Sequence, residues 1–144
     1  MQRARTSGTK PAFQNLIVWQ KAQGLAADVV NLVDALPNKK SANTLGNQVL
    51  RSAASVAANI AEGYGRYSEA AYRNHLSIAR GSLFETESWL DLLLRTGYMS
   101  DEKSQQMVTA CEEVARLLTA AMKPLRNAKS IGTGEEPAEY EPHL

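Results

Sequence analysis

The residues of this chain that could do covalent chemistry are few. Cys111 and His75 are the residue types that form a nucleophile and its general base. Cys111, however, stands at a helical apolar spacing between Met107 and Val114, where a thiol usually serves in packing. We therefore expect no catalytic residue and no enzymatic activity.

The sequence also lacks the residue patterns of a metal site and of a phosphate-binding loop. A di-iron site in a helical bundle needs a glutamate three residues before a histidine, but tyrosines precede His75 and His143 at that spacing. One cysteine and two distant histidines do not make a zinc site. The glycines of EGYGR do not follow a strand, as a dinucleotide-binding loop requires. We expect no metal ion and no other cofactor.

Arginines are the candidates for a binding site. These nucleic-acid-binding candidates are Arg51, Arg66, Arg73 and Arg80. Arg73 and Arg80 are seven residues apart, which places them on one face of a helix. Two interpretations stay open: the arginines form ordinary pairs such as Glu69 with Arg73, or arginines of neighbouring subunits converge on phosphate.

The elements that would hold these side chains are helices. Apolar residues recur at spacings of three and four in four segments, and no sustained alternation indicates a strand. The first helix is expected at about residues 15–36, before Pro37. The second begins within residues 41–46, with Ser41, Asn43 or Thr44 as the N-cap.

Glycine and serine mark the remaining helix ends. Gly63 and Gly65 are interpreted as a flexible turn after the second helix. Ser68 is the expected N-cap of the third helix, and Gly97 follows its last residue. Ser100 opens the fourth helix, which Pro124 ends or kinks.

These helices predict an all-α fold. Short connections favour an antiparallel up-down-up-down four-helix bundle, with three packed helices and a detached fourth as the alternative. We expect the bundle at residues 14–128, a basic flexible tail at 1–13 and an acidic disordered tail at 129–144.

The second helix carries a narrow polar stripe. At about 100° per residue, the stripe fills a sector roughly 80° wide. Its members are Arg51, Ser55, Asn59, Glu62 and Arg66. Glu87 of the third helix falls on that helix's core side and needs a partner, for which Arg51 and Asn59 are candidates. The stripe is therefore predicted to face the third helix or a neighbouring subunit.

Three apolar residues of the third helix fall outside its core stripe, namely Ile78, Trp89 and Leu92. They are either ordinary exposed residues or an interface between subunits, where tryptophan is enriched. The second interpretation predicts a homo-oligomer.

Composition narrows the class of protein further. The chain has 144 residues, 44% hydrophobic and 22% charged, and a formal net charge of +1. Any contact with nucleic acid must therefore use a local patch. No apolar run approaches the ~20 residues of a membrane span, so we expect no membrane and a cytoplasmic location.

The segments QVLRSAASVAANIAEGYGR and YRNHLSIARGSLFETESWLDLLLRTGYM, with FQNLIVWQKAQGLA before them, carry a resemblance. The chain resembles, from about Phe13 to Leu125, the bacterial proteins encoded by intervening sequences of 23S ribosomal RNA genes. The combination of SVAANIAEG and ARGSLFE is specific to that family. Its motif positions here are Arg51, Ser55, Asn59, Glu62, Gly63, Gly81, Ser82 and Glu85.

The resemblance implies an antiparallel four-helix bundle that assembles as a ring-shaped homopentamer, with structural roles for most of the motif positions and no catalytic residue. Similar bundles include the accessory proteins of diversity-generating retroelements, which associate with a reverse transcriptase and bind nucleic acid. The expected function is a non-enzymatic scaffold that binds structured RNA, DNA or a nucleic-acid enzyme such as a reverse transcriptase. The alternative is an oligomeric scaffold or adaptor for proteins alone.

Overall fold

Four helices make up most of the structure. The computed structural model describes residues 12–125. A short turn of 3-10 helix, η1 (Phe13–Asn15), precedes α1 (Ile17–Asp34), α2 (Lys40–Tyr64), α3 (Glu69–Arg95) and α4 (Asp101–Met122). No strand occurs within residues 12–125, so the predicted all-α class is confirmed.

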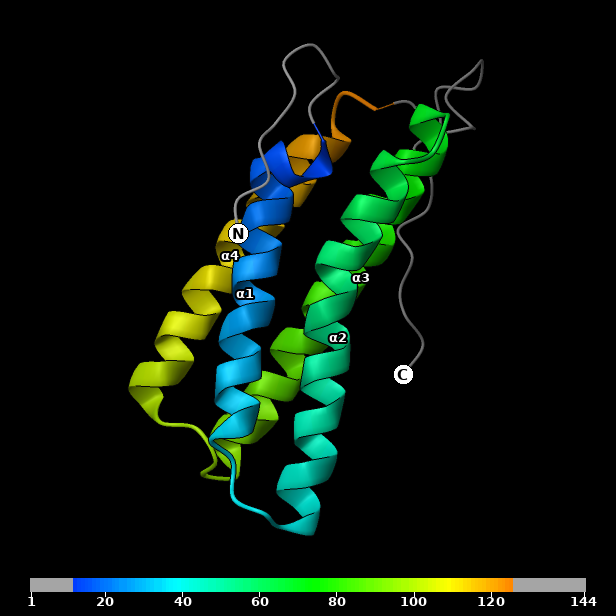
Figure 1. Ribbon diagram of the computed structural model, residues 1–144. Coiled ribbons are helices and arrows are strands. Elements are labelled where there is room, and N and C mark those ends of the chain that lie inside the picture. The colour runs from blue at the N-terminus through cyan, green and yellow to red at the C-terminus, as the bar shows by residue number, and fades with distance from the viewer. Residues whose placement is uncertain (1–11, 126–144) are drawn as a thin grey trace, which may run out of the picture.

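The helices form one bundle around a common core. Each helix contacts the next one in the sequence, and α4 also contacts α1. Figure 1 shows the α1–α2 and α3–α4 connections at one end of the molecule and the α2–α3 connection at the other. All four helices contribute fully buried side chains, among them Val29, Val56, Ile60, Leu76, Leu83, Met107 and Leu118.

Side chains and backbone at the ends of α3 and α4 follow the sequence rules. The hydroxyl of Ser68 accepts a hydrogen bond from the Ala71 amide, and that of Ser100 accepts one from the Lys103 amide, both at 3.1 Å. Each bond satisfies an amide that the helix itself leaves unpaired. Gly97, just after α3, has a φ of +79°, which other residues rarely adopt. These three predicted boundaries are confirmed.

The start of α2 differs from the prediction. The helix begins at Lys40, and its N-cap Lys39 makes no side-chain capping bond. The three expected caps lie inside the helix instead: Thr44 donates to the Lys40 carbonyl at 3.0 Å, and Ser41 hydrogen-bonds Tyr98 at 2.7 Å. The hydroxyl–phenol bond links α2 to the segment after α3, whereas a capping hydroxyl bonds a backbone amide of its own helix.

Gly63 also has a different role from the flexible turn that was predicted. It lies within α2 and is buried, and its φ is not positive, because Gly97 alone among the described glycines has that geometry. The predicted tails lie almost wholly outside residues 12–125. Phe13, placed in the first tail, packs edge-on against Trp19 with ring centroids 5.2 Å apart.

Candidate functional site

The polar stripe of α2 lies against α3. Three pairs of side chains connect the two helices: Arg51 with Glu85, Ser55 with Ser82 (Oγ–Oγ 3.0 Å) and Asn59 with His75 (Oδ1–Nδ1 3.4 Å). The pairs advance in opposite directions along the two helices, so α2 and α3 are antiparallel. We call these six residues the polar seam. Of the two predicted alternatives, the third helix and a neighbouring subunit, the structure shows that this part of the stripe faces the third helix.

A buried hydroxyl pair lies beside the seam and was not predicted. Ser52 and Thr86 are both fully buried, and Thr86 Oγ1 lies 2.8 Å from Ser52 Oγ. Ser52 in turn donates to the Val49 carbonyl at 3.1 Å, so the pair meets the rule that buried polar groups are bonded. The signal was present in the sequence, because Ser52 and Thr86 each directly follow a seam residue, Arg51 and Glu85.

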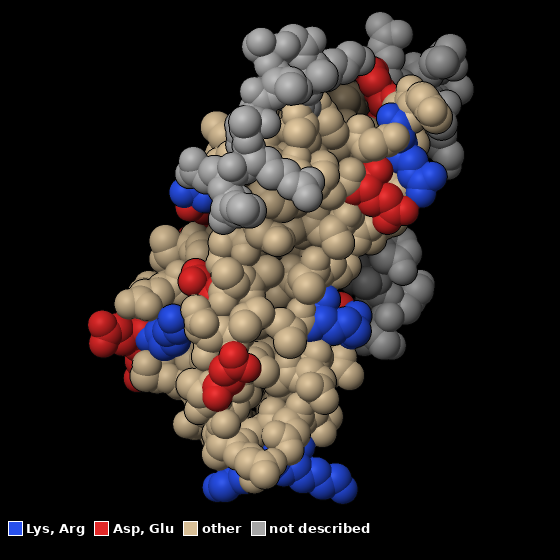
Figure 2. Space-filling model, viewed as in Figure 1, with Lys and Arg blue, Asp and Glu red and all other residues tan. Residues whose placement is uncertain are grey.

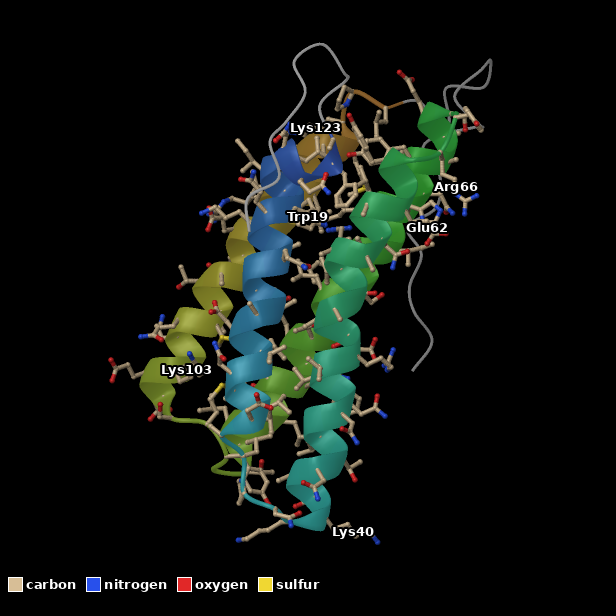
Figure 3. All side chains as sticks on the ribbon, in the orientation of Figure 1. Trp19, Lys40, Glu62, Arg66, Lys103 and Lys123 are labelled. Atoms are coloured by element: carbon tan, nitrogen blue, oxygen red, sulfur yellow. The ribbon has the colours of Figure 1, made fainter. Side chains whose placement is uncertain are left out.

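At the α2–α3 connection the seam ends in a charged group. Arg66 Nη2 lies 2.8 Å from Glu62 Oε1, four residues earlier. The other carboxylate oxygen of Glu62 is 4.0 Å from His75 Nδ1. Figure 3 shows Glu62 and Arg66 close together near the end of α2. Arg66 is therefore balanced locally by an acid.

The structure does not bring the four candidate arginines together. Arg51 and Arg66 each hold a glutamate. Arg80 instead places its guanidinium 5.0 Å from the ring centre of Phe84, and it lies about 140° around α3 from Glu85 at 100° per residue. Arg80 and Arg51 thus lie on different sides of α3.

Arg73 and Arg80 differ from the other two in their charge environment. Within the part of the chain that the structure describes, neither forms an ion pair. Arg73 is half-buried and Arg80 is exposed. Their spacing of seven residues places them about 10.5 Å apart along the axis of α3. Among residues 12–125, Arg73 and Arg80 are therefore the arginines of α3 that form no ion pair with an acid.

The partner predicted for Glu87 is wrong. Arg51 pairs with Glu85, two residues away, and the Asn59 amide donates to the Ser55 carbonyl at 2.9 Å. Glu87 is only partly buried. Burial, and then the negative charge of Glu112 on α4, raise the pKa of the Glu87 carboxyl. Partial contact with water therefore takes the place of an ionic partner.

Cys111 lies next to the same carboxylates. It is fully buried. Burial first, then the charges of Glu87 and Glu112, raise the pKa of its thiol to about 12. A thiol with such a pKa carries almost no thiolate near neutral pH, and thiolate is the form that attacks.

The three residues of the predicted subunit interface separate into two groups. Ile78 and Leu92 are 46% and 37% exposed. Trp89 is half-buried against the core, and its indole nitrogen donates to Glu85 at 3.3 Å. Gly81, three residues after Ile78, is exposed, and a Cβ built there would meet nothing within 4 Å. Ile78, Gly81 and Leu92 are the outward members of this side of α3.

Charge on the visible face of the molecule is scattered. Figure 2 shows small neighbouring groups of both signs across this face, with positive charge lacking a red neighbour only at the end where α2 begins. Lys40, labelled in Figure 3, lies at that end. An open hollow of about 520 Å³ is lined there by Lys40, Ser41, Thr44 and Leu45.

The described residues contain neither a metal-binding cluster nor a helix that could span a membrane. Residues 12–125 contain no group of three histidine, cysteine or acidic side chains that could hold a metal ion. In the same range, no helix combines the length and the apolar character that crossing a membrane requires.

The fold and its polar seam define a class of protein: a small all-helical protein in which side-chain hydrogen bonds join α2 to α3. Residues 14–120 match the model of the family described as 23S rRNA-intervening sequence protein. The chain belongs to this family.

A solved structure supports the same assignment. It is the crystal structure of a protein with unknown function from the S23 ribosomal protein family of Bacteroides thetaiotaomicron VPI-5482. The two chains are 36% identical with a TM-score of 0.70, and the match covers 74% of this chain and 99% of that one. No protein with a curated description matches this chain.

Proposed function

We propose that this chain is a non-enzymatic scaffold, an up-down-up-down bundle that assembles as a ring-shaped homo-oligomer and binds structured RNA. A nucleic-acid enzyme such as a reverse transcriptase is the protein partner that fits this role, and a pentamer is the assembly that the family resemblance implies. The family description names an intervening sequence of 23S rRNA, and this association is the reason that structured RNA is the ligand proposed first.

One observation carries the nucleic-acid proposal: Arg73 and Arg80 share a face of α3, and neither has an acidic partner among residues 12–125. A guanidinium with no carboxylate can give its charge to phosphate at little cost, because no existing ion pair has to break. Arg51 and Arg66 would first have to leave their glutamates. The proposed contact surface is therefore Arg73 and Arg80, and the other two arginines belong to the bundle.

A different observation supports assembly. Glycine inside a helix costs about 1 kcal/mol relative to alanine, and nothing within residues 12–125 occupies the space beside Gly81. The backbone of a second subunit's helix would use that space, with Ile78 and Leu92 as apolar contacts on either side. This surface is the proposed subunit interface.

A scaffold for proteins alone is the second candidate. The net charge of +1 and the neutralised Arg51 and Arg66 favour it, since both reduce the attraction of the whole surface for a polyanion. In that case α3 would contact a protein through the same exposed apolar residues.

Light scattering on the purified protein, with and without a structured RNA at low and moderate salt, tests the proposal. We expect one oligomer that binds RNA with a strong dependence on salt. Changing Arg73 and Arg80 together to Gln should abolish that dependence. The same change at Arg51 and Arg66 removes equal charge and should preserve RNA binding; equal loss in both variants would contradict the assignment to α3. An oligomer that ignores RNA would favour the protein scaffold.

A further inference from the structure

Phe84 is an exposed aromatic residue that the bundle does not use. It lies on α3 with 46% of its surface exposed and is absent from the core and from the residues packed against it. Within residues 12–125 its ring interacts with Arg80, whose guanidinium lies 5.0 Å from the ring centre. The Phe84 ring therefore has the positive charge of Arg80 beside it, while nearly half of the residue stays accessible to solvent.

The position of Phe84 relative to the arginines is regular. At 100° per residue, Arg73, Arg80 and Phe84 fall within a sector of about 40° on α3. Along the helix axis they stand at 0, about 10.5 and about 16.5 Å. Two positive charges and one aromatic ring thus form a single line on one side of the bundle.

Unpaired nucleotides carry the two kinds of group that these three side chains can bind, namely bases and phosphates. Aromatic rings bind bases by stacking, and every base has a face that can stack, whereas the bases of a duplex are already stacked on one another. Arginines beside the ring bind the phosphates of the same strand. A protein surface that bound only duplex phosphates would gain nothing from an exposed ring.

We propose that Arg73, Arg80 and Phe84 form a site for a single-stranded segment of nucleic acid, with an unpaired base against Phe84 and phosphates on the two arginines. This inference rests on the proposed function and deepens it, because it names the strand state that is recognised. In a structured RNA the ligand is then an unpaired loop, bulge or end.

The test compares one strand in two states. A fluorescent oligonucleotide of unpaired adenosines and the same strand annealed to its complement are titrated with the full-length protein by anisotropy. We expect tighter binding of the single strand. Phe84→Leu keeps an apolar side chain but removes the stacking face, and it should weaken single-strand binding by ~10-fold while leaving duplex binding unchanged.

Two variants serve as matched controls. Val30→Ala removes an apolar side chain that is 41% exposed on α1 and should not change the affinity for either form. Arg95→Gln removes one positive charge from α3 at a position already paired with Asp91, and it should not change the affinity. Arg80→Gln removes one charge from the proposed site. It should weaken binding and lower the slope of log affinity against log salt by about 0.7. Circular dichroism checks that each variant is folded.

The outcomes separate the two proposals. Binding of both strand forms with equal affinity, unaffected by Phe84→Leu, would overturn the single-strand site and leave the nucleic-acid scaffold in place. No binding of either form by the unmodified protein would overturn both. Preference for the single strand that depends on Phe84 and Arg80, but not on Val30 or Arg95, supports the site.

Discussion

Gly63 of α2 lies so close to His75 of α3 that a Cβ added to the glycine would be 2.5 Å from the histidine Cβ. Real Cβ atoms do not approach carbon so closely, and the Cβ of His75 is fixed to its backbone. The second helix therefore needs glycine at this position for α3 to reach its observed distance. The same close approach brings His75 within reach of Asn59 and Glu62.

Gly63→Ala should lower the free energy of unfolding by about 1–3 kcal/mol, the usual cost of overpacking. Denaturant unfolding followed by circular dichroism measures it. Gly24→Ala is the matched control, because a Cβ there meets nothing within 4 Å, and it should stabilise the helix by about 0.5–1 kcal/mol. Similar effects at both glycines would show that the α2–α3 distance does not depend on Gly63.

Gly81→Ala is expected to act in opposite directions on the subunit and on its assembly. Because the Cβ has free space within the chain, helix propensity should stabilise the isolated subunit by about 1 kcal/mol. If another subunit's helix lies against Gly81, the same methyl group should weaken the oligomer. Light scattering over a range of protein concentrations measures this, and an oligomer that remains intact on dilution would remove Gly81 from the interface.

Ile78→Glu provides an independent test of that interface. Ile78 is 46% exposed, so the charge should leave the bundle folded and separate the subunits. Trp89 is less suitable, since it packs on the core and its substitution would also remove core packing. Val108→Glu on α4, where the valine is 39% exposed, is the control and should not change the molecular mass in solution.

Glu87 predicts a pH dependence of stability. Burial and the charge of Glu112 raise the pKa of the Glu87 carboxyl in the folded state, so the folded protein binds this proton more tightly than the unfolded chain. The contribution of the protonated Glu87 carboxyl to the free energy of unfolding is then fully present below the unfolded pKa of about 4.3. It is lost as the pH rises through the folded pKa.

Glu87→Gln should therefore stabilise the protein at neutral pH, and the gain should disappear toward pH 4. Thermal unfolding across that range measures the difference. In a Glu112→Gln background the gain should be smaller, because one cause of the raised pKa is removed. A gain that is the same at all pH values would exclude ionisation of Glu87 as its origin.

Cys111 should react with iodoacetamide only when the protein unfolds. Its thiol is buried and has a pKa of about 12, so at pH 8 roughly one molecule in 10⁴ carries the thiolate. Labelling followed by mass spectrometry should be slow in buffer and fast in denaturant. Rapid labelling of the folded protein would mean that α4 opens locally.

Local rules predicted the helices well where the deciding residue acts on its own helix. Ser68, Ser100 and Gly97 are of this kind, because a cap bond or a positive φ depends on three or four neighbouring residues. The start of α2 was missed because the hydroxyl of Ser41 bonds Tyr98 from a distant part of the chain. Sequence spacing cannot show such a competing partner.

The candidate site shows the same limit. Helical spacing left the third helix and a neighbouring subunit as the surfaces that the polar stripe could face, and it offered Arg51 or Asn59 as partners of Glu87. The structure pairs Arg51 with Glu85 instead. Both glutamates lie on α3 two residues apart, and only the packing of α2 on α3 decides which one faces Arg51. Phe84 was not predicted as a binding residue, because a single exposed aromatic residue does not stand out in the helical pattern. Its importance follows from the position of the Arg80 guanidinium over its ring.

The polar seam also limits how the gene can change in length. Its pairs are spread along both helices. One residue added to α3 between His75 and Ser82 would rotate the two parts of α3 relative to each other by about 100°. The pairs on one side of the insertion could then form only if the pairs on the other side were broken. An apolar contact surface would tolerate such a shift better, because dispersion contacts have no fixed partner. Insertions and deletions in homologous chains should therefore gather in the connections and tails and spare α2 and α3.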